Sequence, residues 1–477
     1  MNEPDSAAGP DAESEPGAPP YLPGARDEAL TPEGRPRPGY TDVMGELAEA
    51  DLKGITDSVE RHLRERQVNF RSEGDSRAFH VDPVPRILEA AEWNGLAFGM
   101  RQRARALNAF IADVYGDRRI VKEGVLPARV IDSARHFEPD AVGMPVHGGH
   151  APVVGFDLVR GADGRFGVLE ENLRTPSGLA YGSAARGAVD AAVPFDPPSG
   201  RRELGPSFSS LREAIRAAAP DGAGDPSAVL LSDGPFNSAW YEHRELSTRL
   251  EIPIVTADEI HQRGGRLHYT GEDGRSREIN VVYRRTDEDR LADERRNPTW
   301  LAELLLEPVR RGRVSVVNGL GAGIGDDKLT HAYVQQMIRF YLEQEPMLSS
   351  VRTYDLGDEE VREEVLGRLD EMVVKPRAGY GGEGVVICRN APADDLRRIE
   401  RLIRARPDSF VAQELVALSS HPTVFDGEME PRHVDLRAFS IGEEVAPGAL
   451  TRVALKQGSM IVNSSQDGGG KDTWLLS

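Results

Sequence analysis

Residues 153–174 read VVGFDLVRGADGRFGVLEENLR, and this stretch predicts a β-hairpin that ends in carboxylates. Two apolar runs flank a turn containing Asp163 and Gly164, a pair typical of hairpin turns. Glu170 and Asn172 are two residues apart, so their side chains share one face of the second strand. Asp157, on the first strand, can lie beside them. Two carboxylates and an amide oxygen suit Mg²⁺, and a salt-bridged hairpin end is the structural alternative.

A glycine-rich turn follows the strand that ends at Lys375, in EMVVKPRAGYGGEGVVIC (371–388). Glycines let backbone N–H groups approach a phosphate, and Lys375 adds a positive charge. The spacing is not GxxxxGK[ST] and no helix follows at once, which disfavours a P-loop or Rossmann site. An ordinary hairpin with a glycine turn remains open.

Three further stretches carry polar groups at the ends of predicted elements. Gln413 and Glu414 close the strand SFVAQE, where they can face an adenine or lie in solvent. In GDDK (325–328), Asp327 is a natural helix N-cap, whereas Lys328 at a helix N-terminus is explained by a bound phosphate. Arg174, Arg437 and Arg452 can clamp a phosphate or a substrate carboxylate, or can form an Arg–Asp network that holds a sheet.

The wider pattern predicts α/β and α+β units around these motifs. Residues 1–38, rich in Pro, Gly and acidic residues, are expected to be a disordered tail. Residues 39–224 contain helices and the hairpin. Residues 225–350 alternate short apolar runs with helices, which indicates an open, mainly parallel sheet, and residues 351–477 indicate an α+β unit with an antiparallel sheet.

Composition narrows the classes of function. With 29% charged residues, no apolar run of about 20 residues and no secretory signal, the chain is expected to be cytoplasmic and not to bind a membrane. A net charge of -20 argues against nucleic acid as a partner. Cys388, the single cysteine, falls in an apolar strand and is expected to be a packing residue. His147 and His150 lack neighbouring ligands, so zinc is disfavoured.

Taken together, these motifs resemble the circularly permuted ATP-grasp family, type 2, a relative of the glutathionylspermidine synthase ATP-grasp domain. The resemblance covers about residues 40–474 and rests on DPVPRI, QRARALNAF, GFDLVR, VLEENLRTPSG, NSAWYEH, VVYRR, GDDK, VVKP, PRHVDLRAF, LTRVAL and NSSQ. It departs from the family pattern at Glu171, where Asp is common, and at Ala449 and Asp467, where glycine is usual.

The resemblance implies a circularly permuted ATP-grasp fold with ATP and Mg²⁺ as its cofactors. It implies phosphate contacts from Lys328 and Lys375, a phosphate cover at Gly381, Gly382 and Gly384, an adenine hinge at Gln413 and Glu414, and Mg²⁺ ligands Asp157, Glu170 and Asn172. It also implies a carboxylate–amine ligase acting on a peptide or amino-acid carboxylate and a small amine, with an alpha-E helical protein and a transglutaminase-like protein as partners. Phosphotransfer to another acceptor, partner-coupled ATP hydrolysis and non-catalytic nucleotide binding are the alternatives.

Overall fold

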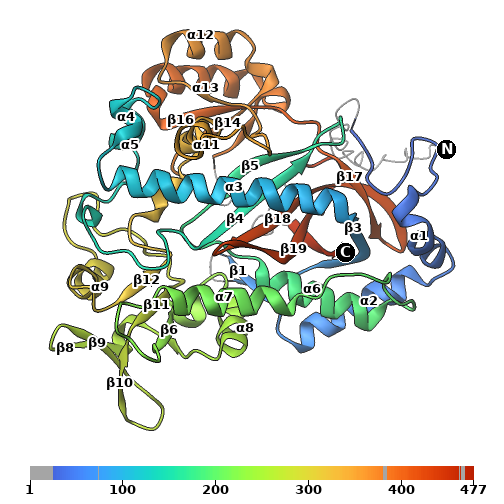
Figure 1. The fold of residues 1–477 in the computed structure, drawn as a ribbon. Coiled ribbons are helices and arrows are strands. Elements are labelled where there is room, and N and C mark those ends of the chain that lie inside the picture. Colours follow the sequence, from blue (N-terminus) through green and yellow to red (C-terminus); the bar gives the residue numbers. More distant parts are fainter. Residues whose placement is uncertain (1–24, 73–74, 380–383, 461, 463–467) are drawn as a thin grey trace, which may run out of the picture.

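Three main β-sheets, each with its own helices, make up the computed structural model of the protein (Figure 1). The structure describes residues 25–72, 75–379, 384–460, 462 and 468–477. Within these ranges, none of the helices is long and apolar enough to cross a bilayer. The mixed α/β content agrees with the expected fold class.

The largest sheet has seven strands and joins segments from both ends of the chain. Its order is β3-β20-β19-β18-β4-β5, and β17 pairs with β18; only β20 and β3 run parallel. The strands are β3 (Val81–Leu88), β4 (Val153–Arg160), β5 (Phe166–Asn172), β17 (Ser420–Phe425), β18 (Glu428–Ile441), β19 (Glu444–Ala454) and β20 (Gly468–Leu475). The predicted hairpin is therefore present as β4 and β5, with Gly164 at a positive φ of 79° in the turn.

Helices cover both faces of this sheet, because successive strand residues point to opposite sides. Ala449 packs in the cluster around α3 (Ala90–Val114), whereas Leu450 packs with α6 (Leu179–Ala192) and α2 (Leu52–Glu65). In Figure 1, α3 runs across one face of the sheet and α6 lies against the other. A side chain on β4 or β5 therefore faces either α3 or the opposite side.

The second sheet is fully parallel, as the sequence predicts for residues 225–350. Its order is β12-β11-β6-β7. Its strands and helices are β6 (Ala228–Leu231), β7 (Ile254–Val255), β11 (Val281–Arg284), β12 (Ser315–Val317), α7 (Gly205–Ala217), α8 (Trp240–Leu250) and α9 (Trp300–Arg310). α10 (Lys328–His331) and α11 (Val334–Leu342) follow.

The third sheet is small and antiparallel, in the order β13-β16-β14-β15. It is covered by α12 and α13, at the top of Figure 1. Its elements are β13 (Thr353–Asp355), β14 (Met372–Pro376), β15 (Val386–Ile387), β16 (Phe410–Glu414), α12 (Glu359–Gly367) and α13 (Ala393–Ala405).

The remaining α-helices and strands lie outside these three sheets and their covering helices. They are α1 (Thr41–Ala48), α4 (Arg119–Lys122), α5 (Ala128–Asp132), β1 (Asn69–Ser72), β2 (Asp75–Ala78), β8 (Ile260–Arg263), β9 (Arg266–Thr270) and β10 (Ser276–Ile279).

Two expected boundaries differ from the structure. Residues 351–477 are not one unit, because β17 to β20 belong to the large sheet and only residues up to 414 form the small one. Strand pairing between distant segments decides this, and the hydrophobic pattern of a single strand does not specify its partner.

The disordered tail predicted for residues 1–38 is wrong for residues 25–38, which are packed against the protein, and residues 1–24 lie outside the described residues. Glu28 is buried and forms ion pairs with Arg86 and Arg160, and Ala29 is fully buried. Burial in this segment depends on the buried arginines of distant strands, a signal that local composition does not contain.

Candidate functional site

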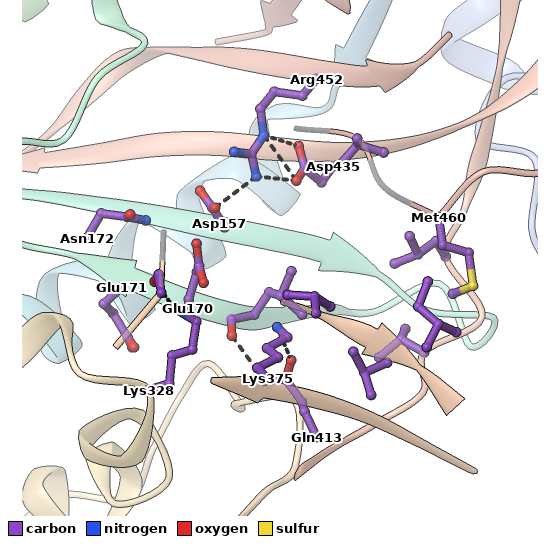
Figure 2. A pocket seen from close by; sticks show the side chains of 18 of the residues that line it. Asp157, Glu170, Glu171, Asn172, Lys328, Lys375, Gln413, Asp435, Arg452 and Met460 are labelled. Carbon is purple, nitrogen blue, oxygen red and sulfur yellow. Dashed lines mark hydrogen bonds and ion pairs between the residues drawn. The ribbon is translucent and has the colours of Figure 1, made fainter. Parts of the chain in front are cut away.

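A cavity of about 350 Å³ lies between the β4–β5 hairpin and the small antiparallel sheet (Figure 2). One end is apolar and the other is lined by charged side chains from several elements. The apolar end is formed by Val373, Ile387, Leu415, Leu418, Met460 and Val462. The polar end contains Asp157, Glu170, Asn172, Lys328, Lys375 and Arg452. Most of the residues singled out in the sequence therefore meet at one place.

The hairpin register brings the three predicted metal ligands onto one face. Asp157 is directly opposite Glu170, and Asn172 is opposite Gly155, two residues before Asp157. Asp157 and Glu170 are therefore cross-strand neighbours on this face of the hairpin. The predicted juxtaposition is confirmed, while the metal-binding role of these residues stays a prediction.

Two arginines neutralise Asp157. Arg437 on β18 contacts both carboxylate oxygens of Asp157, and Arg452 on β19 lies 2.8 Å from Oδ2. Burial alone would raise the pKa of Asp157, but the two guanidinium groups more than offset this and lower it well below its usual range. Arg452 also binds Asp435, so the Arg–Asp network that the sequence offered as an alternative is present.

The side chains of Glu170 and Asn172 both have polar atoms in this cavity that are free to bind a metal ion. Glu170 forms no ion pair within the described part of the chain, and the buried side-chain nitrogen of Asn172 has no hydrogen-bond partner there. The oxygen and nitrogen of an amide are interchangeable by rotation of the side chain, so the orphaned atom can be a ligand oxygen. Carboxylate and amide oxygens at this point fit Mg²⁺. Among the described residues no group of three His, Cys, Asp or Glu could hold a metal ion, so a metal at this point would also need the amide.

Lys375 is buried and is held by Gln413. Its Nζ donates to Gln413 Oε1 at 2.7 Å, and the two residues face the same side of the small sheet. Burial lowers the pKa of Lys375, with a further lowering from Lys328 and an opposing effect of Glu170. The side-chain nitrogen of Gln413 also donates to Leu169 O and Thr353 Oγ1, so both polar atoms of this side chain already form hydrogen bonds.

Glu414, the other predicted hinge residue, points to the opposite face of β16. Its carboxylate accepts a hydrogen bond from the hydroxyl of Tyr354 at 2.7 Å. Residues 414 and 415 line the cavity, and their backbone N–H groups are already paired: Glu414 N donates to Arg352 O and Leu415 N to Glu371 O.

Lys328 lies across the cavity from the hairpin, at the start of α10. Its Nζ donates to Gly379 O at 2.5 Å, and it forms no ion pair with the described residues. Asp327 is the N-cap of α10, as predicted, and is paired with Arg377. Gly384 has a φ of 69°, which favours glycine, whereas Gly381 and Gly382 lie outside the described residues.

Arg174 lies at the polar end of the cavity between two carboxylates. It donates to Asp326 at 2.7 Å and to Asp289 at 3.1 Å. Burial would lower its pKa, but these two carboxylates raise it above its usual value. Asp326 belongs to the GDDK stretch but was given no role from the sequence, and Asp289 was not singled out, although it belongs to an acidic run that follows the strand at 281–284.

Glu171, between two predicted ligands, faces α3 instead of the cavity interior. It pairs with Arg103 of α3, whose Nε is 2.7 Å away, and with His331 of α10 at 2.6 Å. Arg103 also donates to Leu348 O and Ser350 Oγ. This buried group links β5, α3 and α10, and therefore fixes the hairpin relative to Lys328.

The remaining polar candidates lie away from this cavity. Neither His147 nor His150 belongs to a metal-binding group among the described residues. Cys388 is buried just after β15, in a short 3-10 turn and not within the strand, and burial raises the pKa of its thiol to about 11.

Relatives of the chain are found in several bacteria. A Frankia alni protein named "Putative glutamate--cysteine ligase 2-3" is 43% identical over 95% of this chain and 54% of its own length. An uncharacterized Mycobacterium tuberculosis protein is 38% identical over 95% of this chain and 84% of its own length. An uncharacterized Synechocystis protein is 38% identical over 94% of this chain and 96% of its own length. The chain thus spans about half the length of the Frankia relative.

A solved structure shares the fold. It is a glutathione synthetase-like effector from Globodera pallida in its apo form, with a TM-score of 0.54 at 12% identity over 89% of this chain and 97% of that chain. The family model for the circularly permuted ATP-grasp type 2 proteins matches residues 85–454, which include the hairpin, both lysines and both arginine-bearing strands. On this match and on the relatives above, the chain belongs to the circularly permuted ATP-grasp type 2 family.

Proposed function

We propose that the protein is an ATP- and Mg²⁺-dependent carboxylate–amine ligase that acts through an acyl phosphate. The observation that carries the proposal is the arrangement of Lys328 and Lys375 across one cavity from Glu170 and Asn172. Two cations without a carboxylate partner favour phosphate oxygens, and oxygen ligands opposite them suit a phosphate-bound Mg²⁺.

The two ends of the cavity suggest how a nucleotide is oriented. The apolar end, with Val373, Ile387 and Met460, suits the faces of a purine ring. The lysines at the polar end suit the phosphates, with the γ-phosphate nearest Glu170. Gln413 fits this orientation as a positioning residue, because it fixes the ammonium group of Lys375.

When bound, Mg²⁺ would neutralise phosphate charge and align the β- and γ-phosphates for transfer. Glu170 and Asn172 would hold it. Asp157, their cross-strand neighbour, would lie beside the ion while remaining paired with Arg437 and Arg452. The arginine pair then limits the negative charge that accumulates on the hairpin.

The proposed reaction has two steps. An oxygen of the substrate carboxylate attacks the γ-phosphorus, the bond to the β-phosphate oxygen breaks, and ADP leaves. The amine nitrogen then attacks the acyl carbon, a C–N bond forms, and inorganic phosphate leaves while the amine proton passes to phosphate or solvent. The chain supplies position and positive charge, and no protein nucleophile is needed.

The name of the Frankia alni relative supports this class of reaction, since a glutamate--cysteine ligase joins a carboxylate to an amine. The identity of the substrates is part of the proposal, and a peptide or amino-acid carboxylate with a small amine is the class we propose. Partner proteins of the alpha-E and transglutaminase-like kinds also remain proposals.

The test is ADP release with Mg²⁺ and ATP over a panel of amino acids, short peptides and amines, with hydroxylamine added to trap the acyl phosphate. We expect carboxylate-dependent ADP formation and a hydroxamate in the same reaction. ADP formation without hydroxamate and without any dependence on a carboxylate would favour coupled hydrolysis or another phosphate acceptor. ATP binding without turnover under all conditions would favour a binding protein.

A further inference from the structure

Two consecutive arginines stand at the carboxyl end of β11, and they differ in how they are neutralised. Arg285 is paired with Glu242 at 3.0 Å. Arg284 is also buried, with 4% of its surface exposed, but it forms no ion pair with any residue that the structure describes. Because a buried guanidinium without a carboxylate partner is strongly unfavourable, the surroundings of Arg284 should contain the reason for its position.

The hydrogen bonds of Arg284 are also incomplete. Its Nη2 donates to the backbone oxygen of Arg174 at 3.2 Å, whereas its buried Nη1 has no hydrogen-bond partner within the described ranges. Arg174 is the residue whose side chain lines the polar end of the cavity in Figure 2, here called the first cavity. Arg284 does not line this cavity. A ligand there would therefore contact Arg174 and not Arg284.

Arg174 binds two carboxylates at the same time. It donates to Asp326 at 2.7 Å and to Asp289 at 3.1 Å. The same two carboxylates are the acidic groups that act electrostatically on Arg284, and the effect of Asp289 is the larger. Two cations and two anions therefore lie close together, and in this structure both anions are bound to one of the cations.

A second cavity, of about 420 Å³, adjoins the first and gives these side chains space to move. Arg174 and Asp326 line both cavities, and Asp289 lines the second. The guanidinium group of Arg174 can therefore move towards the first cavity, and the carboxylate of Asp289 can reorient, without displacing the packed core.

The two carboxylates differ in what would still neutralise them if the side chain of Arg174 moved away. Asp326 would keep the two backbone N–H groups that donate to its Oδ1. Asp289 would keep only His136, whose ring nitrogen is 3.8 Å away. Burial lowers the pKa of His136 to about 4, so its ring is uncharged near pH 7. The neighbouring cation that can neutralise Asp289 is therefore Arg284.

We propose that a γ-phosphate bound beside Glu170 draws the side chain of Arg174 away from Asp289, and that Arg284 then becomes the ion-pair partner of Asp289. This inference rests on the proposed nucleotide site and describes how the site changes when a nucleotide binds. Arg284 is a positioning residue in this scheme, because it acts through Asp289 and does not touch the nucleotide. Its Nη1, which has no partner here, supplies the donor for Asp289.

The experiment compares the binding of a non-hydrolysable ATP analogue and of ADP to the full chain by calorimetry, both with Mg²⁺. The two nucleotides differ in the γ-phosphate, so the ratio of their dissociation constants isolates its contribution. Arg284→Met removes the alternative partner of Asp289, so Arg174 should stay bound to Asp289. We expect this variant to bind the ATP analogue about tenfold more weakly, with the affinity for ADP unchanged.

A substitution of Asp289 distinguishes this role of Arg284 from a purely structural one. Asp289→Asn removes the charge that Arg284 would neutralise, so the Arg284→Met/Asp289→Asn double variant should regain at least the wild-type affinity for the ATP analogue. A structural defect would not be rescued in this way, because the space left by the arginine side chain would remain. Arg284→Lys keeps a cation and should bind the analogue more tightly than Arg284→Met.

Arg295→Met, at an exposed position in the loop that follows β11, is the matched control and should leave both affinities unchanged. Unchanged affinity for the analogue in Arg284→Met would overturn the inference. Equal losses for the analogue and for ADP, without rescue by Asp289→Asn, would also overturn it. If Arg284→Met does not fold, Asp289→Asn alone is the test: it releases Arg174 from one carboxylate and should tighten binding of the analogue relative to ADP, and an unchanged ratio would overturn the inference.

Failure of this inference and failure of the proposed function give different results. If the wild-type chain binds neither nucleotide with Mg²⁺, the proposed nucleotide site is wrong, and the inference is wrong with it. If the analogue binds tightly and Arg284→Met does not change its affinity, only the inference is wrong. Loss and rescue of analogue affinity without any hydroxamate formation would support the inference and count against the acyl-phosphate ligase.

Discussion

At the scale of single residues, Lys375 is the most exacting test of the proposed chemistry. Its ammonium group is buried, held by Gln413 and without a carboxylate partner among the described residues. Replacing it with alanine should remove a charge that stabilises the transferring phosphoryl group. By analogy with a lost oxyanion donor, we expect ADP formation to fall by about 10²–10³, equivalent to about 2.7–4 kcal/mol.

Initial rates of ADP release at saturating ATP measure this effect, and Lys53→Ala on the exposed face of α2 is the control. Thermal unfolding should show that Lys375→Ala is still folded. A folded variant with the wild-type rate would remove Lys375 from the mechanism.

A substitution at Glu170 distinguishes a metal-binding role of this residue from a structural one. Glu170→Gln keeps the shape of the side chain but removes a charged ligand, so Mg²⁺-dependent turnover should fall more than nucleotide affinity does. The measurement is the Mg²⁺ dependence of ADP release beside the dissociation constant of an ATP analogue. If affinity and turnover fall by the same factor, Glu170 supports the hairpin and does not bind the metal.

Glu171 should control stability in acid. Burial would raise its pKa, but Arg103 and His331 lower it to about 2, compared with 4.5 for the free side chain. A lowered folded-state pKa means that the contribution to stability is complete above about pH 4.5 and is lost as the pH falls towards 2. Glu171→Gln should cost about 3–5 kcal/mol near neutral pH, because Arg103 is left buried without its partner.

Urea midpoints of wild type and Glu171→Gln across pH check this prediction, and their difference should begin to shrink only below about pH 4.5. The double variant Arg103→Met/Glu171→Met should be less destabilised than Glu171→Gln, since it leaves no unpaired charge at this pair. A difference in urea midpoint that stays constant down to pH 3 would show that protonation of Glu171 does not change the stability of the protein.

The residues that sequence reasoning could place are those whose partners are close in the chain. Asp157, Glu170 and Asn172 were predicted to share one face because a short hairpin sets their register, and the register places them so, while their convergence on a metal stays a prediction. The pairing of Asp157 with Arg437 and Arg452 could not be predicted, because β4 and β18 are separated by more than 260 residues. Gln413 was expected to face the adenine. Its contact with Lys375 could not be predicted, because this contact depends on the register of two strands.

At the scale of elements, the segment 25–38 is held by one buried carboxylate. Glu28 contacts Arg86 at 2.6 Å and Arg160 at 3.2 Å, and Arg86 is fully buried. Removing residues 1–38 should therefore destabilise the protein by about 3–5 kcal/mol, because a buried guanidinium loses its partner.

A chain that begins at residue 25 is the control, and thermal unfolding of the two truncated chains is the measurement. Glu28→Gln in the full chain should reproduce most of the loss. Equal melting temperatures for the two truncations would show that Arg86 finds another partner or that its burial costs little.

Individual strands and helices were largely predictable, but their assignment to sheets was only partly so. The strands at 228–231, 281–284 and 315–317 pair in parallel as their alternation with helices predicts. β17 to β20 read as neighbours of the small sheet, yet they pair with β3 and β4. Alternating hydrophobicity specifies which face of a strand is buried, and it does not specify which strand lies beside it.

At the scale of the whole molecule, a bound nucleotide should stabilise the packing of the large sheet against the small antiparallel sheet. The walls of the first cavity come from the large sheet and from the small antiparallel sheet. A ligand that binds only the folded state at a hundred times its Kd stabilises that state by about 2.7 kcal/mol. We expect a Mg²⁺-dependent rise in melting temperature with a non-hydrolysable ATP analogue, reduced in Lys375→Ala. A rise that is the same with and without Mg²⁺ would argue against a metal at Glu170.

The place of β20 between β19 and β3 has a consequence for how the protein is made. β3 ends at Leu88, and its parallel neighbour β20 begins at Gly468, so a ribosome must synthesise β4, β5 and the whole parallel sheet before this pair can form. Until then β3 has no strand partner on a growing nascent chain, and an unpaired strand edge favours aggregation. The parallel sheet, built from residues 228–317, is complete much sooner. Synthesis is therefore expected to yield a folded parallel sheet first and the completed large sheet only after β20 has been added.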